Sequence, residues 1–295
     1  MTPAGVLLSQ IAGVAFLGVA YGMVLYVISV GLSITMGLMG FVNLAHGVFA
    51  MTGGFILSVA MARLGIGFPL AVLAAFLGAA ALGAAAERLL YARLYGAGER
   101  AQVLFTIALI FIAASIARLS FGTQAAQIRL PGVLHGQIAL FGRAFPTYRA
   151  LLILLGCGIA GVLWFGIERT RWGAMVRASV DNRGMAQSVG IDTGRLFTLT
   201  FALGSGMAGL GGALGADILP PQWNYPQEHL VYFLIVVAVG GLGSLRGAFA
   251  AALLIGIADT ACRYWAPALG AFVVYGATIA LLLWRPLGLF GAARA

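Results

Sequence analysis

The sequence lacks lysine altogether, because all 17 of its basic residues are arginines. A P-loop ATPase needs a lysine that reaches the nucleotide phosphates, so this chain carries no such ATPase site of its own. Charge of either sign is scarce: charged residues make up 8% of the chain and hydrophobic residues 62%. Soluble domains carry about 25% charged residues, so a soluble globular fold is excluded.

Cysteine and ionisable side chains are also scarce. Cys157 lies inside one apolar run and Cys262 at the end of another, a placement that predicts neither a disulfide framework nor a metal site. The chain has 3 histidines and 8 scattered acidic residues, so no metal, cofactor or paired-carboxylate chemistry is predicted. A proton-coupled carrier would need more buried ionisable groups than these.

Two glycine-flanked serines, Ser205 and Ser244, could suggest a hydrolase. Neither has the GlyxSerxGly spacing of a nucleophile elbow, and such serines in membrane helices are more often packing residues. We therefore predict no catalytic residue and no enzyme. The net charge of +9 comes from arginines dispersed among apolar segments, so it does not indicate a nucleic-acid partner.

Apolar runs, in contrast, are abundant, and a bilayer crossing needs about 20 such residues. Together with a mean hydropathy of +1.03, they predict an all-α polytopic membrane protein in contact with the lipid bilayer. Residues 1–295 are expected to form a single transmembrane domain with about nine crossings, eight or ten being open alternatives. The expected spans are Ile11–Met36, Val48–Ala62, Leu70–Ala86, Val103–Leu119, Leu151–Ile167, Leu196–Ala216, His229–Val239, Ala248–Cys262 and Ala268–Trp284.

Glycine-rich stretches at 37–47 and 239–247 interrupt these runs and predict broken or re-entrant helices. Irregular backbone at membrane depth is tolerated where protein or a cavity satisfies it. Interrupted helices in corresponding halves of a chain are typical of transport pathways. The candidate pathway residues are therefore Asn43, His46, Gly240, Gly241, Gly243 and Ser244. The alternative for Asn43 and His46 is that they only hydrogen-bond backbone groups that the break frees.

Two local patterns predict particular contacts between or within helices. Gly18 and Gly22 have the GlyxxxGly spacing that allows two helices to approach closely. Asp259 lies late in an apolar run, whereas most acidic residues lie in loops. We expect Asp259 to pair with Arg263, one turn further along the same helix.

The most strongly charged segment is Glu168–Arg195, which separates two apolar runs and contains five arginines. Arginine accumulates in short cytoplasmic loops, so this loop is expected to face the cytoplasm. Apolar residues recur in it at helical spacing and predict a short amphipathic helix outside the membrane. They are Met175, Ala178, Met185 and Val189. Such a helix either binds a partner or packs on its own protein.

Four stretches of the chain resemble one family, the membrane permeases of branched-chain amino-acid ABC transporters of the LivH type. They are GlyLeuMetGlyPheValAsnLeuAlaHisGly at 37–47, the segment 177–201 that begins ArgAlaSerValAsp, ValGlyGlyLeuGlySerLeuArgGlyAla at 239–248, and ArgProLeuGlyLeuPheGly at 285–291. Their order and spacing extend the resemblance over essentially the whole chain. The chain departs from the family at Val48, usually acidic, and at Arg246, usually proline or a small residue.

The resemblance implies a permease subunit of an importer in the bacterial inner membrane, with ATP hydrolysed by a separate subunit. Its implied partners are a second permease, two ABC ATPase subunits and a periplasmic or extracellular solute-binding protein. The implied substrates are branched-chain or other apolar amino acids, with urea, short amides or small organic acids as alternatives. A stand-alone channel or secondary carrier is the alternative function. Residues expected to dock the ATPase are Arg177, Asp181, Arg183, Met185, Ala186, Gly190 and Ile191.

Overall fold

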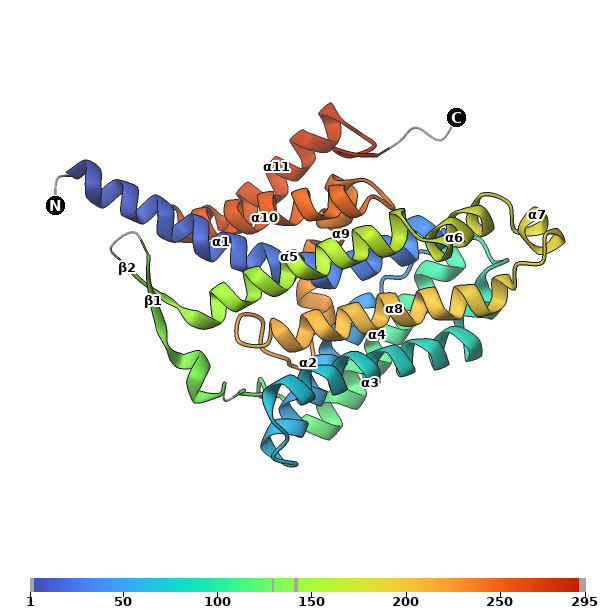
Figure 1. Ribbon diagram of the computed structural model, residues 1–295, viewed down its shortest axis with the longest axis horizontal. Coiled ribbons are helices and arrows are strands. Elements are labelled where there is room, and N and C mark those ends of the chain that lie inside the picture. Colours follow the sequence, from blue (N-terminus) through green and yellow to red (C-terminus); the bar gives the residue numbers. More distant parts are fainter. Residues whose placement is uncertain (1–2, 129, 141–142, 292–295) are drawn as a thin grey trace.

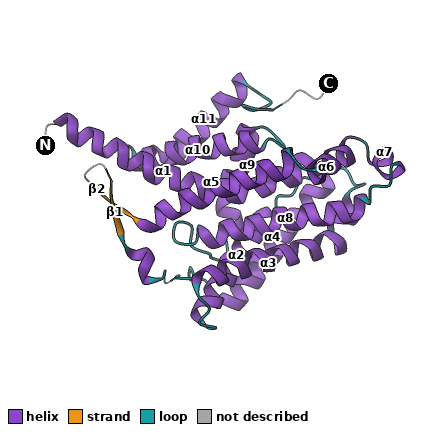
Figure 2. Cartoon of the chain, in the orientation of Figure 1, coloured by secondary structure: helices purple, strands orange, loops and turns teal. Residues whose placement is uncertain are grey.

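The computed structural model describes residues 3–128, 130–140 and 143–291, and its regular structure is almost entirely helical (Figures 1 and 2). The helices are α1 (Pro3–Ser33), α2 (His46–Ala62), α3 (Phe68–Leu89), α4 (Glu99–Phe121), α5 (Thr147–Glu168), α6 (Arg171–Asp181), α7 (Arg183–Ser188), α8 (Thr193–Leu214), α9 (Tyr225–Gly240), α10 (Leu245–Trp265) and α11 (Gly270–Trp284). A π-helical turn, Ile34–Leu38, extends α1, and a 3₁₀ turn, Tyr91–Leu94, follows α3. An antiparallel hairpin of β1 (Gln137–Leu140) and β2 (Arg143–Pro146) lies between α4 and α5.

The lengths of the helices confirm a polytopic all-α membrane protein. Among the described residues, six helices are long and apolar enough to cross a bilayer, namely the segment Leu7–Gly37 and helices α3, α4, α5, α8 and α10. Two shorter apolar helices, α2 and Phe272–Trp284 of α11, add to them. Helices suit a lipid bilayer because they satisfy their backbone hydrogen bonds within one segment, whereas lipid tails offer no hydrogen-bond partners. The total number of membrane crossings, about nine with eight or ten as alternatives, stays a prediction.

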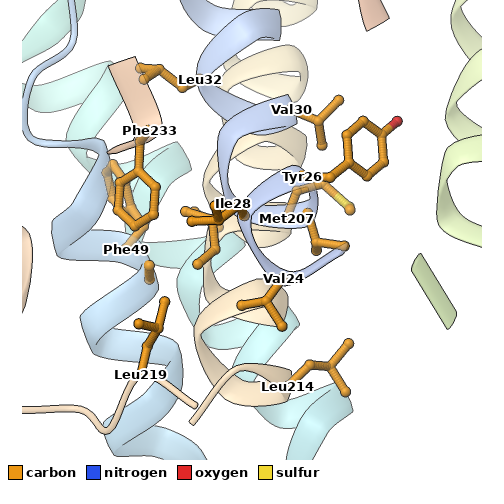
Figure 3. Close-up of a cluster of buried hydrophobic side chains, with 14 of the residues drawn as sticks. Val24, Tyr26, Ile28, Val30, Leu32, Phe49, Met207, Leu214, Leu219 and Phe233 are labelled. Atoms are coloured by element: carbon orange, nitrogen blue, oxygen red, sulfur yellow. The ribbon is translucent and has the colours of Figure 1, made fainter. Parts of the chain in front are cut away.

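Helices α1 and α8 form the centre of the bundle, and α4 and α5 lie at its edge. The most apolar window of α8 is 78% buried, whereas those of α4 and α5 are each 22% buried. Side chains of α1 fill the space between α2, α8 and α9 (Figure 3). The labelled core residues are Val24, Tyr26, Ile28, Val30, Leu32, Phe49, Met207, Leu214, Leu219 and Phe233. The exposed leucines of the outer helices suit a lipid-facing surface.

Small residues allow the central helices to touch along their backbones. A Cβ atom added at Gly22 of α1 would lie 2.7 Å from the carbonyl oxygen of Ala252 in α10, and one added at Gly18 would lie 2.7 Å from the Cα atom of Ile257. The predicted close contact through the GlyxxxGly pair is confirmed. A Cβ atom at Gly53 of α2 would lie 2.1 Å from the carbonyl oxygen of Gly209 in α8.

The predicted pairing of Asp259 and Arg263 is also confirmed. Arg263 Nε lies 2.6 Å from Asp259 Oδ2, and the hydroxyl of Tyr232 in α9 donates to Asp259 Oδ1 at 3.1 Å. The Asp259 side chain is 3% exposed. Because both carboxylate oxygens have partners, the buried acid joins α9 to α10 as a structural group.

Candidate functional site

The charged segment Glu168–Arg195 folds as two helices rather than one. They lie at one end of the bundle, and the hairpin lies at the opposite end (Figure 1). Asn182 separates them: its backbone is extended, with φ −150°, and its side-chain oxygen accepts a hydrogen bond from Met185 N at 2.9 Å. Asparagine is a favoured N-cap residue because its side chain satisfies an otherwise free backbone N–H.

The predicted stripe of Met175, Ala178, Met185 and Val189 therefore does not lie along a single helix. Met175 and Ala178 belong to α6, Met185 belongs to α7, and Val189 follows the end of α7. The spacing was compatible with one long helix, but the capping property of Asn182 outweighed it. In this arrangement the Met185 side chain is 65% exposed and the Val189 side chain is 71% exposed.

Most residues predicted to dock an ATPase lie on the surface of α6, α7 and the turn after them. Arg177, Asp181, Arg183, Met185 and Gly190 are exposed, Ile191 is half-buried and Ala186 is buried. Gly190 has φ +87°, a left-handed conformation that side chains with a Cβ atom rarely adopt. This glycine ends α7 and turns the chain toward α8.

Two of the arginines also fasten these helices to the bundle, which the sequence did not predict. Arg177 Nη1 donates to the carbonyl oxygen of Ile167 in α5 at 2.6 Å. Arg183 Nε and Gln187 Nε2 donate to Thr193 Oγ1 of α8 at 3.4 and 2.9 Å. Helix α7 therefore projects one face outward while its polar side chains connect it to the start of α8.

The first predicted break is present and is narrower than 37–47. Helical backbone continues to Met39 and resumes at His46, so residues 40–45 form the break. Asn43 and His46 are both buried: Asn43 Oδ1 accepts from the Tyr91 hydroxyl at 3.3 Å, and His46 Nε2 donates to the carbonyl oxygen of Ile28 in α1 at 3.0 Å. Asn43 Nδ2 and His46 Nδ1 have no partner among the described residues.

Gln102 is a residue of the break region that the sequence analysis missed. Its side-chain oxygen accepts from the backbone N–H of Val42 at 3.1 Å, and its side-chain nitrogen donates to the carbonyl oxygens of Leu94 and Ala97, both at 3.2 Å. It therefore satisfies backbone that the break leaves unpaired. The sequence feature that could have identified Gln102 is a polar amide side chain in the first turns of an apolar span.

Glu87 is a second missed residue: it follows the expected span Leu70–Ala86 directly, and it lies in the last turn of α3. It is 3% exposed, and it accepts hydrogen bonds from the Tyr95 hydroxyl at 2.8 Å and from Thr198 Oγ1 of α8 at 2.6 Å. Burial, helped by the Glu87 carboxylate, raises the pKa of Tyr95 well above its usual value. The Tyr95 hydroxyl therefore keeps its proton and remains a donor.

The second predicted break is also narrower than 239–247 and lies against the first. Helix α9 includes Gly240, and α10 begins at Leu245, where the side chain of Ser244 accepts from Gly247 N at 3.0 Å. A Cβ atom added at Gly37, just before the first break, would lie 2.1 Å from the Cα atom of Gly243. One added at Gly241 would lie 2.5 Å from Gly291 N. The structure thus brings the two glycine-rich segments together.

Arg246, one of the departures from the family pattern, connects α10 to the end of α5. It forms an ion pair with Glu168 at 2.8 Å and lies over the ring of Trp164 at 4.8 Å. An open cavity of about 380 Å³ adjoins it, lined also by Tyr26 and Phe249. A second, apolar cavity of about 710 Å³ lies among α2, α3 and α4. The predicted pathway residues line neither of these two cavities.

Two helix breaks that lie against each other, in a bundle that also carries an exposed helical segment at one end, are an arrangement suited to a transporter. The family model described as "Branched-chain amino acid transport system / permease component" matches residues 14–283 of the chain. The chain belongs to this permease family. It is therefore a multi-pass membrane protein and a permease component of a transport system, as the sequence resemblance implied.

Several curated permeases are similar to this member of the family. The high-affinity branched-chain amino acid permease BraD of Pseudomonas aeruginosa is 27% identical over 93% of this chain and 94% of its own length. The corresponding LivH of Escherichia coli K12 is 27% identical over 94% of both chains. The fructose import permease FrcC of Rhizobium meliloti is 26% identical over 43% of this chain and 37% of its own. No solved structure matches the chain.

Proposed function

We propose that this permease is the membrane-spanning subunit of an ATP-driven importer for branched-chain or other apolar amino acids in a bacterial inner membrane. It works with a second permease, two ATPase subunits and a periplasmic or extracellular solute-binding protein. Membership of the permease family supports the transport role. The printed names of BraD and LivH, which match over nearly their full lengths, support the substrate class. Urea, short amides and small organic acids remain alternative substrates.

The observation that carries the proposed ATPase contact is the exposed surface of α6 and α7. Met185 of α7 and Val189 just after it are large, apolar and exposed, and the same segment also exposes Arg177, Asp181 and Arg183. Exposed apolar groups rimmed by charges are typical of a protein–protein contact. Such a contact is unexplained if the chain is a stand-alone channel or secondary carrier, which is the rival function.

In this mechanism the permease does no covalent chemistry. ATP-driven closure of the two ATPases moves α6 and α7, and the helix breaks at 40–45 and 241–244 rearrange with them. The energy comes from the separate ATPase subunits, because this chain lacks the lysine of a P-loop.

The docking surface is tested by two matched substitutions. Met185→Glu places a charge on α7, and Val133→Glu places the same charge at a residue that is 86% exposed in the connection between α4 and α5. We expect Met185→Glu to weaken ATPase binding at least about tenfold, because the interface would bury an unpaired charge. Val133→Glu should leave binding unchanged. The measurement is the amount of ATPase that co-purifies with the permease from native membranes.

Both substituted side chains are exposed, so both proteins are expected to fold, which size-exclusion chromatography in detergent verifies. Equal ATPase recovery with Met185→Glu and wild type would contradict docking at α7. Failure of wild-type permease to retain any ATPase would favour the stand-alone carrier.

A further inference from the structure

We infer that a cluster of four aromatic residues, three of them buried and the fourth half-buried, couples helix α7 to the first helix break. The cluster consists of Phe41, Tyr91, Tyr95 and Phe197, which come from the break, the 3₁₀ turn after α3, the connection to α4 and the first turns of α8. It would transmit movement of a docked ATPase to Asn43. This inference rests on the proposed docking of an ATPase at α7.

The first link joins α7 to the start of α8. The guanidinium carbon of Arg183 lies 5.3 Å from the centre of the Phe197 ring, a cation–π distance. Arg183 and Gln187 also donate to Thr193, one helical turn before Phe197. A shift of α7 therefore acts on Phe197 through both its ring and the backbone that carries it.

The second link passes from Phe197 to the break through Tyr95. The Tyr95 ring lies 5.7 Å from the Phe197 ring and 5.8 Å from the Phe41 ring, with edge-to-face geometry at both contacts. Its hydroxyl is fixed by the buried carboxylate of Glu87. Because contacts at its edge and at its hydroxyl restrict rotation of the Tyr95 ring, a displacement of Phe197 is transmitted to Phe41.

The third link acts within the break itself. Tyr91 packs edge-to-face on Phe41 at 5.1 Å, and its hydroxyl donates to Asn43 at 3.3 Å. Gln102 holds the intervening Val42 through its backbone N–H. Three consecutive residues of the break, 41–43, are thus bonded or packed to the turn after α3 and to the first turn of α4, rather than to their own helix.

Most of this cluster is buried, which distinguishes it from a group of aromatic residues on the protein surface. Tyr91 and Asn43 are 0% exposed and Phe41 is 1% exposed. Residues 40–45 lack the regular hydrogen bonds of a helix, so they are the part of this region that can rearrange when the rings move. The packed rings of the cluster can transmit a displacement, and the irregular backbone of residues 40–45 can respond to it.

The test measures amide hydrogen exchange at residues 40–45 in the purified complex of permease and ATPase, with and without a non-hydrolysable ATP analogue. Tyr91→Phe removes only the hydroxyl that donates to Asn43. Tyr148→Phe is the matched control, because it removes another buried hydroxyl, which donates to the carbonyl oxygen of Leu214 at 2.6 Å. We expect the nucleotide-dependent change in exchange to fall about fivefold in Tyr91→Phe and to persist in Tyr148→Phe.

Phe197→Leu supplies a second, independent variant that keeps the site apolar. It should also reduce the nucleotide-dependent change, and the double variant Tyr91→Phe/Phe197→Leu should be no worse than the more damaged single variant, because both interrupt one chain of contacts. An unchanged response in both single variants, or no response of residues 40–45 in a wild-type complex that retains its ATPase, would overturn the coupling cluster alone. Failure of wild type to bind ATPase would overturn the docking proposal as well.

Discussion

Gly53→Leu is expected to prevent α2 from packing against α8. The Cβ atom of any side chain at this position would lie 2.1 Å from the carbonyl oxygen of Gly209 and 2.4 Å from its Cα atom. Backbone atoms cannot relieve the clash by changing rotamer, as a side chain can, so the two helices must separate. Overpacking in cores typically costs about 1–3 kcal/mol, and a backbone clash of this kind should exceed about 3 kcal/mol.

The control for this substitution is Gly276→Leu in α11, where a Cβ atom would meet nothing within 4 Å. Both changes replace a helical glycine with leucine, so they share the same gain in hydrophobicity and helix propensity. Fluorescence-detected size-exclusion chromatography after mild heating should show aggregation of Gly53→Leu and a wild-type profile for Gly276→Leu. If Gly53→Leu were as thermally stable as the wild type, α2 and α8 would not be in contact at Gly53 and Gly209.

Arg263→Leu is expected to destabilise the protein because it leaves the carboxylate of Asp259 buried without a counter-charge. Arg263 Nε lies 2.6 Å from that carboxylate, which is 3% exposed. Removing one partner of an ion pair that is buried on both sides costs about 3–5 kcal/mol. The Arg263 side chain is 65% exposed and the Tyr232 hydroxyl still donates to Asp259, so we expect a smaller loss of about 1–2 kcal/mol.

A second substitution distinguishes the buried charge from lost packing. Asp259→Asn/Arg263→Leu keeps an acceptor for Tyr232 and removes the charge, so it should recover most of the stability that Arg263→Leu alone loses. Thermal unfolding in detergent gives both values. If the double variant is less stable than Arg263→Leu, the arginine stabilises α10 through its aliphatic stem and not through the ion pair.

Composition and local pattern were sufficient to predict the general architecture. A chain with so little charge and so many apolar runs has to satisfy its backbone inside helices, and glycine-rich stretches beside Asn43 and Ser244 mark where those helices stop. The GlyxxxGly pair and the Asp259–Arg263 pair depend on residues one turn apart within one helix. Their contacts follow from helical geometry, which is why they could be predicted.

Contacts between distant segments could not be predicted in the same way. Glu87 and Thr198 are 111 residues apart, and Gln102 caps a backbone group 60 residues earlier in the chain. Such pairs depend on how whole helices pack, which local spacing does not encode. Buried polar residues near the ends of apolar runs are nevertheless a usable signal, because each needs a partner that lipid cannot supply.

The division of the charged segment at Asn182 has a different cause. The spacing of Met175, Ala178, Met185 and Val189 follows a helical period, but a period in apolar residues does not reveal the capping side chain between them. The side chain of Asn182 accepts a hydrogen bond from Met185 N and so caps a new helix, and such capping competes directly with continued helical backbone. The ATPase-docking role of the two resulting helices remains a proposal.

Uptake of radiolabelled leucine into proteoliposomes is the most direct test of ATP-driven import. The liposomes contain the permease with its co-purified second permease and ATPase, and the solute-binding protein is added on the outside. We predict leucine accumulation that needs both internal ATP and the binding protein, and none with the permease alone. Leucine entry through the permease alone, without ATP, would contradict the importer and establish a stand-alone carrier or channel.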